Sequence, residues 1–355
     1  MKIAIITFQD AINYGAAMQA FALKQVMGEY GKCDIINYYN EFFHKYKEKK
    51  SVKDFVSLML NTWTHEKKRG KFEKFQSNYL TDFTKQYTDD ELGELNSKYD
   101  LFITGSDQVW NLECSGNKTA YFLDFVEDNN KKASYAASFG GTYLTNELLI
   151  KNMLSSFSNI SIREESGKQF LKKLLGRDCP VVLDPTLLLD KEEWKNYFQL
   201  GLNEEYVLVY EVLNGSKLLS LAKQYAMEYH LTLKYITSSN RPQLGIQCIR
   251  DASPEEWLQL IANSAYVFTN SFHGLAFSLI FEKQFAVELL PPPATTNGRL
   301  IELLQQLGLE ERVISDCLPP HGINYNSVNM KLKTMREKSL AYICKMVGVS
   351  MKSES

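Results

Sequence analysis

The chain has 355 residues, 45% of them hydrophobic, and a formal net charge of -2. This length can bury two cores of ordinary size, so we expect two domains, and the near-neutral charge gives no reason to expect a nucleic-acid partner. The six cysteines lie far apart, with no C-x-x-C pair and no metal-ligand spacing. This spacing favours reduced thiols in a protein without a metal site.

The N-terminal segment is predicted to form a βαβ unit. Residues 3–7 are typical of a buried strand, 16–30 of a helix and 34–38 of a second strand. This order predicts a parallel sheet with ligands at the carboxyl ends of its strands. Asp10 follows the first apolar run before a secretory signal could form, and no apolar run approaches the length of a membrane span. We therefore expect a cytoplasmic protein.

Residues 41–98 interrupt this pattern. Ten cations from Lys45 to Lys74 are interleaved with apolar residues such as Phe55 and Trp63. We interpret the segment as a pair of amphipathic helices inserted into the first domain, with a solvated basic face. The alternative is peripheral membrane contact, in which 41–78 touches anionic lipid headgroups.

The α/β pattern then resumes through the rest of the chain. Strands are expected at 100–104, 132–137, 160–162, 181–183, 206–212, 231–237, 266–270 and 285–289. Helices are expected at 216–229, 254–263, 274–281, 298–307 and 326–346. We predict a first Rossmann-like domain at 1–189 that carries the insertion, a second at 190–325, and a C-terminal helix and tail at 326–355. The two domains are expected to face a cleft.

Two turns in the first domain carry candidate binding residues. Asn13 and Gly15 lie where a strand gives way to a helix, whose positive end favours an anion. Ser106, Asp107 and Gln108 follow the strand at 100–104 and offer polar groups to hydroxyls. Trp110 supplies an apolar surface on which a sugar ring could stack. The alternative for this second turn is a capped turn with a packing tryptophan.

Further candidates follow later strands. Arg163 comes directly after an apolar strand and could bind an anion, or it could pair with Glu164 or Glu165.

Ser271, His273 and Gly274 form a strand-to-helix turn in which Ser271 caps the helix and His273 carries a proton. A core histidine beside a helix start is the alternative. Arg299 adds a cation or lies on the surface of the helix that it opens. Together these turns indicate an anionic ligand and a hydroxyl-rich partner, without a metal or another cofactor.

The motifs resemble those of the polysaccharide pyruvyl transferase family over most of the chain. The matching pieces, in order, are Asn13-Tyr14-Gly15-Ala16, Gly105-Ser106-Asp107-Gln108-Val109-Trp110-Asn111, Tyr135-Ala136-Ala137-Ser138-Phe139-Gly140, Arg163-Glu164, Leu183-Asp184-Pro185-Thr186 and Ser271-Phe272-His273-Gly274. The resemblance implies a glycosyltransferase-B-like fold and phosphoenolpyruvate as the donor. It also implies a glycan acceptor, a precursor of exopolysaccharide or capsule that could be lipid-linked, which receives a ketal-linked pyruvate. Some family members carry an arginine where this chain has Ser271, which shifts the neutralisation of the donor phosphate to Arg163 and Arg299.

On this hypothesis, His273 is the general acid that protonates the donor and Asp107 orients or deprotonates the acceptor hydroxyl. Arg163 or Arg299 holds the donor. Two other functions remain open at this point. A metal-independent glycosyltransferase would use a nucleotide sugar on the same fold. A non-catalytic glycan-assembly protein would use the basic insertion and would not need His273.

Overall fold

The computed structural model describes residues 1–44, 55–81, 85–140, 146–201, 206–212, 217–237, 243–291, 297–314 and 322–349, with the side chains of 55–63 excepted. The chain divides into two compact units. The first comprises Met1–Tyr46, Gln76–Leu189 and Leu332–Ser355. The second comprises Lys47–Phe75 and Asp190–Lys331.

The first unit is built on a four-stranded parallel sheet with the order β2-β1-β3-β4. Its strands are β1 (Lys2–Ile6), β2 (Lys32–Ile35), β3 (Leu101–Thr104) and β4 (Lys132–Ser134). Ile3 pairs with Cys33 on one side and with Leu101 on the other. The continuous apolar runs suit this sheet, because helices cover both faces of a parallel sheet.

Two further expected strands appear only as isolated bridges in this unit. Ala137 pairs with Ile162, and Ile162 pairs with Val181. These segments are too short for a full ladder, yet they carry the chain alongside β4. Arg163 and Asp184 therefore come just after these bridged segments, at the same edge of the sheet as the carboxyl ends of β3 and β4.

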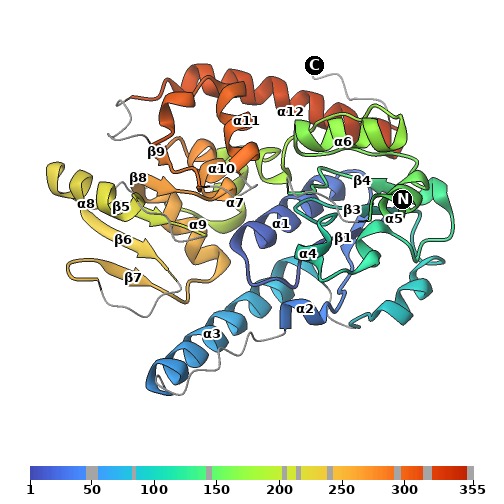
Figure 1. Cartoon of the computed structure of the whole chain (residues 1–355), viewed down its shortest axis with the longest axis horizontal. Coiled ribbons are helices and arrows are strands. Elements are labelled where there is room, and N and C mark those ends of the chain that lie inside the picture. Colours follow the sequence, from blue (N-terminus) through green and yellow to red (C-terminus); the bar gives the residue numbers. More distant parts are fainter. Residues whose placement is uncertain are drawn as a thin grey trace. The chain divides into compact units, whose positions relative to one another are not determined.

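The helices of the first unit connect these strands. They are α1 (Tyr14–Gly28), α2 (Glu41–His44), α4 (Leu112–Ser115), α5 (Glu147–Ser155) and α6 (Glu165–Leu175), with short 3-10 segments that include η3 (Asp89–Leu95), η4 (Thr119–Phe122) and η6 (Pro185–Leu187). α1 is rich in alanine and is buried on nearly all sides. It therefore forms a central helix of the unit (Figure 1) and contacts β2 and η6.

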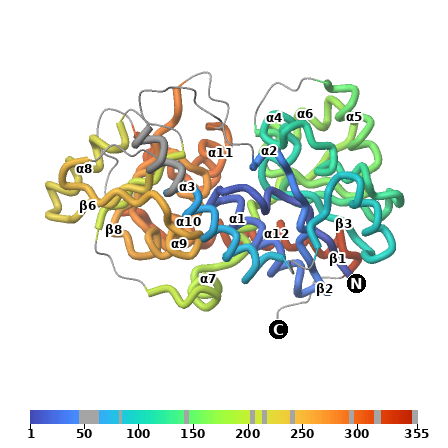
Figure 2. Tube along the Cα trace, turned by 90° about the horizontal axis from the view of Figure 1, so that it is seen from below, coloured from blue at the N-terminus to red at the C-terminus, as the bar shows by residue number. Residues whose placement is uncertain are grey.

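The long helix α12 (Tyr325–Val347) contributes its residues from Leu332 onward to the first unit. The hydroxyl of Ser339 accepts a hydrogen bond from the Leu183 N–H at 3.0 Å. The hydroxyl of Tyr342 donates to the Ser134 carbonyl at 2.9 Å. Figure 2 shows the end of this helix beside β1 and the N-terminus. The last helix thus completes a unit that begins with the first strand.

The second unit contains a five-stranded parallel sheet with the order β7-β6-β5-β8-β9. Its strands are β5 (Tyr206–Tyr210), β6 (Thr232–Ile236), β7 (Gln247–Ile249), β8 (Ser264–Thr269) and β9 (Gln284–Val287). Its helices are α3 (Phe55–Phe75), α7 (Lys191–Phe198), α8 (Leu218–Glu228), α9 (Pro254–Ala262), α10 (Phe272–Ile280) and α11 (Asn297–Leu307). Buried residues of β5, β8 and β9 form the core with α8 (Figure 1). Each unit is therefore Rossmann-like, as the sequence predicts.

The basic segment differs from its expected place, because α3 belongs to the second unit and not to the first. Lys71 pairs with Glu256 of α9 at 2.7 Å, and Lys67 pairs with Asp251 at 2.5 Å. Phe75 stacks on Phe198 of α7. These contacts attach the helix to α7 and α9. The cations from Lys45 to Lys53, and the side chains of Phe55, Leu58 and Trp63, lie outside the described residues.

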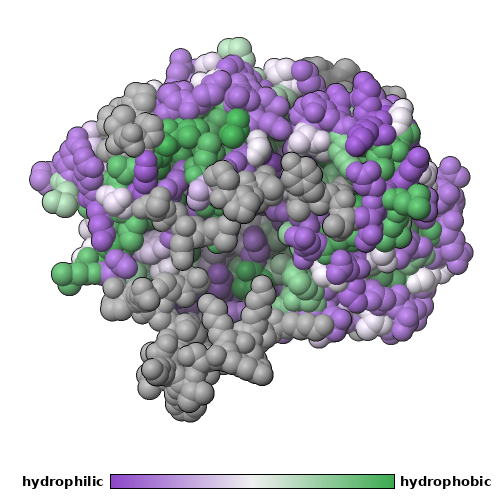
Figure 3. Space-filling model, viewed as in Figure 1, coloured by the Kyte–Doolittle hydropathy of each residue, from purple (hydrophilic) through white to green (hydrophobic). Residues whose placement is uncertain are grey.

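The surface visible in Figure 3 is mostly hydrophilic, with hydrophobic residues in separate patches. Exposed apolar side chains such as Leu148, Met227 and Leu244 lie on different elements. Scattered exposure of this kind is normal for a folded protein. None of the helices in the described part of the chain has the length and apolar character of a membrane span.

Candidate functional site

The turn after β3 is held by a glycine that no other residue could replace without rearrangement. Gly105 has a φ of 113°, and a Cβ there would lie 2.3 Å from the Tyr135 carbonyl oxygen. The next residue, Ser106, is fully buried. Its hydroxyl donates to the Ala136 carbonyl and to Asp184, and its N–H donates to Gln19. Ser106 therefore fixes the turn from within the protein, whereas the sequence predicts a substrate contact there.

Arg163 lies among three carboxylates in the first unit. Its NH1 is 2.8 Å from Asp184, its NH2 is 3.3 Å from Asp107, and its Nε is 4.0 Å from Glu164. Burial alone would lower the pKa of Arg163, but the charges of Asp107 and Asp184 outweigh that effect and raise the pKa above its usual value. The guanidinium is permanently charged and compensates buried carboxylates.

This arrangement favours the ion-pair alternative for Arg163 over the predicted donor-binding role. Its side chain is only 2% exposed, and the surrounding charges are negative. An incoming phosphate would have to displace carboxylates from the guanidinium and would be repelled by them. The sequence alternative of an ion pair with Glu164 is closer to the structure, although Asp184 and Asp107 are the nearer partners.

Asp107 is the most accessible carboxylate of this group, with 13% of its side chain exposed against 2% for Glu164 and 0% for Asp184. Its Oδ1 accepts the Gln108 N–H at 2.9 Å as well as the Arg163 contact. Its backbone has a φ of 74°, a conformation in which aspartate is enriched among non-glycine residues. The turn therefore presents one oriented carboxylate at the carboxyl end of β3.

Gln108 packs against a second glycine. A Cβ on Gly140 would lie 2.1 Å from Gln108 Oε1. The same oxygen is 3.5 Å from the amide nitrogen of Asn111, the cap of α4. Gln108 thus connects the turn after β3 with the turn after β4.

Trp110 is not a sugar platform in this structure, which corrects the sequence expectation. Its side chain is fully buried, and its ring is stacked with Phe122 at a centroid distance of 6.1 Å. Phe139 and Phe157 contact it from other sides, and its Nε1–H donates to the Tyr121 carbonyl. The turn directs this residue into the core, so the alternative of a packing tryptophan is correct.

The start of α1 is capped by Asn13. Asn13 is exposed, has extended backbone and accepts the Ala16 N–H at 3.1 Å. Gly15 is buried in the first helical turn. This cap uses one of the N–H groups that a helix start leaves without an intrahelical partner, and the remaining N–H groups still give the helix end a positive character.

The second unit contains the strand-to-helix turn between β8 and α10. The hydroxyl of Ser271 accepts the Gly274 N–H at 3.3 Å, so Ser271 caps α10 as predicted. The Thr269 hydroxyl accepts the Ser271 N–H at 3.0 Å and donates to the Tyr210 carbonyl at 2.7 Å. A Cβ on Gly274 would lie 2.3 Å from the Thr269 hydroxyl oxygen. Glycine is therefore required for this turn to close against the end of β5.

His273 lies in the first turn of α10, with 7% of the residue exposed. Its ring meets the edge of Phe272 at a centroid distance of 5.4 Å. The guanidinium carbon of Arg299 lies 5.7 Å from the centre of the same Phe272 ring. His273 and Arg299 thus both contact the Phe272 ring, at the N-terminus of α10. This combination favours an anion.

Two acidic residues at the strand ends were missed by the sequence reasoning. Glu288 follows β9, is buried, and accepts the Lys217 N–H at 3.0 Å. Glu211 follows β5 and accepts a hydrogen bond from the Tyr235 hydroxyl. Burial, and then this bond to Glu211, raise the pKa of Tyr235 to about 12. The available signal was position, since both glutamates directly follow apolar strands.

No group of three histidine, cysteine, aspartate or glutamate side chains that could hold a metal ion occurs among the described residues.

Comparison with solved structures finds chains of similar fold. The chain aligns with the Staphylococcus aureus MnaA–UDP structure at 11% identity and a TM-score of 0.52, covering 100% of this chain and 99% of that one. The Neisseria meningitidis UDP-GlcNAc 2-epimerase with UDP-GlcNAc gives 11% identity and a TM-score of 0.43, with 99% and 95% coverage. The Escherichia coli heptosyltransferase WaaC with ADP gives 12% identity and a TM-score of 0.42, with 94% and 100% coverage. At these identities the comparison establishes the fold alone, which is glycosyltransferase-B-like.

Comparison with curated protein sequences gives no match. The family model described as polysaccharide pyruvyl transferase matches residues 13–287. This range begins at the cap of α1 and ends with β9, so it includes the turns that carry Asp107, Arg163 and His273. The protein belongs to the polysaccharide pyruvyl transferase family.

Proposed function

We propose that the protein transfers pyruvate from phosphoenolpyruvate to two hydroxyls of one sugar in a cell-surface polysaccharide precursor, forming a cyclic ketal. Family membership supports pyruvyl transfer in general. The observation that carries the finer proposal is the position of His273 in the first turn of α10, near Arg299. A proton donor at an anion-favouring helix end suits an enol phosphate.

The donor is assigned to the α10 turn because Arg163, the candidate cation of the first unit, is already paired with carboxylates. The helix N-terminus attracts negative charge, and Arg299 adds a full positive charge beside Phe272. A bound phosphate near His273 would favour the imidazolium form of the ring. Arg299 therefore takes the phosphate-binding role that the sequence divided between Arg163 and Arg299.

The proposed reaction begins with proton transfer from His273 to the methylene carbon of the donor. This step makes a methyl group and leaves the adjacent carbon electron-poor. A sugar hydroxyl adds to that carbon and loses its proton, the carbon–oxygen bond to phosphate breaks, and a second hydroxyl closes the ketal. Of the two hydroxyl protons, one restores His273 and the other leaves with phosphate. General acid catalysis of this kind typically contributes ~10²–10⁴ in rate.

Asp107 is assigned to the acceptor. Its carboxylate is held by Arg163 and by the Gln108 N–H, and part of it is exposed. A carboxylate fixed in this way can accept a hydrogen bond from a sugar hydroxyl and orient its oxygen. The assignment requires Arg163 to position Asp107 and does not require Arg163 to touch substrate.

Thermal unfolding with added ligands tests the donor. Phosphoenolpyruvate at 100 times its dissociation constant should stabilise the protein by about 2.7 kcal/mol. Inorganic phosphate serves as the control for simple anion binding, while UDP and GDP represent nucleotide-sugar chemistry. Stabilisation by UDP or GDP but not by phosphoenolpyruvate would reject the proposal in favour of a glycosyltransferase. Release of phosphate that depends on an added glycan acceptor would establish turnover.

A further inference from the structure

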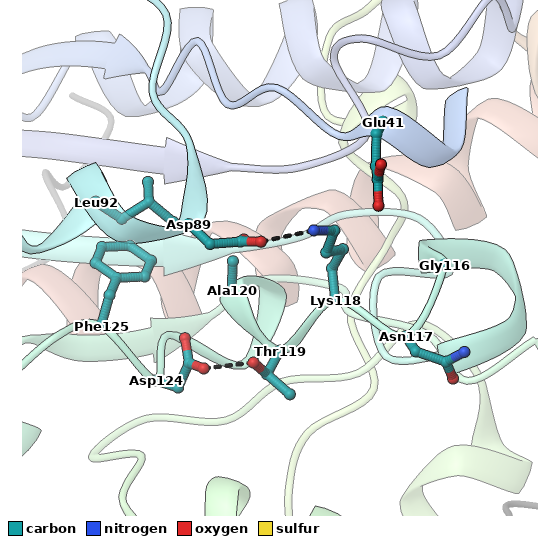
Figure 4. Close-up of a pocket in the computed structure, with 10 residues that line it drawn as sticks. All are labelled: Glu41, Asp89, Leu92, Gly116, Asn117, Lys118, Thr119, Ala120, Asp124 and Phe125. Atoms are coloured by element: carbon teal, nitrogen blue, oxygen red, sulfur yellow. Dashed lines mark hydrogen bonds and ion pairs between the residues drawn. The ribbon is translucent and has the colours of Figure 1, made fainter. Parts of the chain in front are cut away.

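A pocket of 470 Å³ lies in the first unit, away from the turns described above. Three segments form it: the start of α2, the segment η3, and the loop and single turn at 116–125 (Figure 4). None of the candidate residues at the ends of β3, β4 or β8 lines it. Pockets of about 300–1,000 Å³ accommodate small organic ligands. We propose that this pocket binds an uncharged sugar unit of the glycan, an assignment that rests on the proposed function for its glycan.

The polar lining consists mainly of hydrogen-bond acceptors. Glu41 points into the pocket in Figure 4, towards the ion pair of Lys118 with Asp89. That pair has a distance of 2.6 Å, and Asp89 also accepts a bond from the buried Tyr38 hydroxyl. Asp124 accepts the hydroxyl of Thr119 on the opposite side. The pocket is therefore built around carboxylates that are held in place by their own partners.

The charge of this lining selects against anions. Three carboxylates, Glu41, Asp89 and Asp124, face one ammonium group, that of Lys118. Phosphoenolpyruvate, phosphate and acidic sugars would meet net repulsion. A cationic ligand would have to share or displace Lys118 at Asp89, with which Lys118 is already paired. An uncharged ligand with several hydroxyl donors satisfies the acceptors without either penalty.

An apolar surface completes the match to a sugar ring. Leu92 and Ala120 are buried at the edge of the core, and Phe125 is half-buried with its ring packed edge-on against Phe102. Figure 4 shows Leu92, Ala120 and Phe125 on the side of the pocket nearest Asp89. The C–H face of a pyranose can lie on such a surface while its hydroxyls reach the carboxylates. A ligand with only polar groups would leave this surface unused.

This pocket would give the enzyme a preference between substrate and product. Formation of the proposed ketal adds a carboxylate to the sugar and consumes two of its hydroxyl donors. The modified sugar would lose hydrogen bonds in the pocket and gain repulsion from Glu41 and Asp124. The pocket therefore recognises unmodified sugar units of the glycan and excludes pyruvylated ones.

Saturation-transfer NMR on the full chain tests the proposal. The probes are methyl glucoside, methyl galactoside and methyl mannoside, with methyl glucuronide as the anionic analogue and spermidine as the cationic one. We expect at least one neutral glycoside to bind and the glucuronide to fail. The double variant Glu41→Gln/Asp124→Asn should lower the affinity for the neutral sugar by about tenfold or more, because hydrogen bonds to charged groups are lost. Glu113→Gln, an exposed change on α4 outside the pocket, is the matched control.

Three outcomes would overturn the proposal: no neutral glycoside binds, glucuronide or spermidine binds in its place, or the double variant binds neutral sugar as well as wild type does. Thermal unfolding confirms that the variants are folded. His273→Ala should leave neutral-sugar binding unchanged. If the protein does not turn over phosphoenolpyruvate but still binds neutral sugar in a way that depends on Glu41 and Asp124, the proposed function is rejected and the sugar pocket is retained.

Discussion

The turn after β3 in the first unit and the turn before α10 in the second follow the same plan but hold charge differently. Both close around a glycine that lies against neighbouring backbone or a hydroxyl, and both present a titratable side chain at a strand end. At the first turn, Arg163 is surrounded by carboxylates. At the second, His273 and Arg299 adjoin one aromatic ring at a helix N-terminus. The first turn suits a hydroxyl and the second suits an anion.

The largest effect is expected for His273→Ala, which should lower turnover by about 10²–10⁴ if the residue is the general acid. His273→Gln should be nearly as inactive, because an amide can donate a hydrogen bond but cannot protonate carbon. Steady-state phosphate release measures the effect. The exposed His230 is the matched control, and His230→Asn should keep full activity. A folded His273→Ala variant with near-normal turnover would remove His273 from the mechanism.

Arg163→Ala is expected to destabilise the protein by about 3–5 kcal/mol, because it leaves buried carboxylates without their cation. Urea unfolding measures this loss. Arg177→Ala, which removes a part-exposed arginine that bonds backbone carbonyls of the same unit, should cost clearly less. If Arg163→Ala instead has the stability of Arg177→Ala and loses affinity for phosphoenolpyruvate, then Arg163 binds the donor and the contrast between the turns is lost.

Arg299→Ala is expected to weaken phosphoenolpyruvate binding by about 1.5–3 kcal/mol, because in the proposed mechanism the guanidinium binds the donor phosphate. Arg299→Lys should restore part of the affinity, since charge remains but the planar fork is lost. Isothermal titration compares the three proteins. Equal affinities would assign Arg299 to the surface of α11, the alternative that the sequence left open.

The smallest effect is expected for the basic helix α3. Lys67 and Lys71 already pair with Asp251 and Glu256, so they offer little charge to a membrane. Lys67→Gln/Lys71→Gln should not alter sedimentation with anionic or neutral vesicles at low or high salt. Salt-sensitive binding of the wild type to anionic vesicles, lost in this variant, would instead support membrane contact through the helix.

The sequence predicted the strands and the turns because both depend on local pattern. Apolar runs located the main strands, and the helix caps at Asn13 and Ser271 follow from residue type. The three-residue strand β7 was missed because its partly exposed sequence carries no apolar run. Local pattern was sufficient for the fold class, including two parallel α/β units.

The direction of the side chains could not be predicted in the same way. Arg163 meets Asp184 and Asp107 from positions 21 and 56 residues away, and nothing near it in sequence reveals those partners. Trp110 follows a polar turn, yet Phe122, Phe139 and Phe157 enclose it. Both features depend on tertiary packing between segments that the sequence shows only separately. The sequence placed the candidate residues at strand ends, whereas the surroundings of Ser106, Trp110 and Arg163 required the structure.

The position of α12 affects the order in which the chain can fold during synthesis. Ser339 and Tyr342 form hydrogen bonds with Leu183 and Ser134, so the first unit needs residues that are synthesised after the strands of the second unit. Apart from α3, the second unit is continuous from Asp190 to Lys331 and has all its strands before then. During synthesis, the second sheet can therefore assemble before α12, which the first unit needs, has been made.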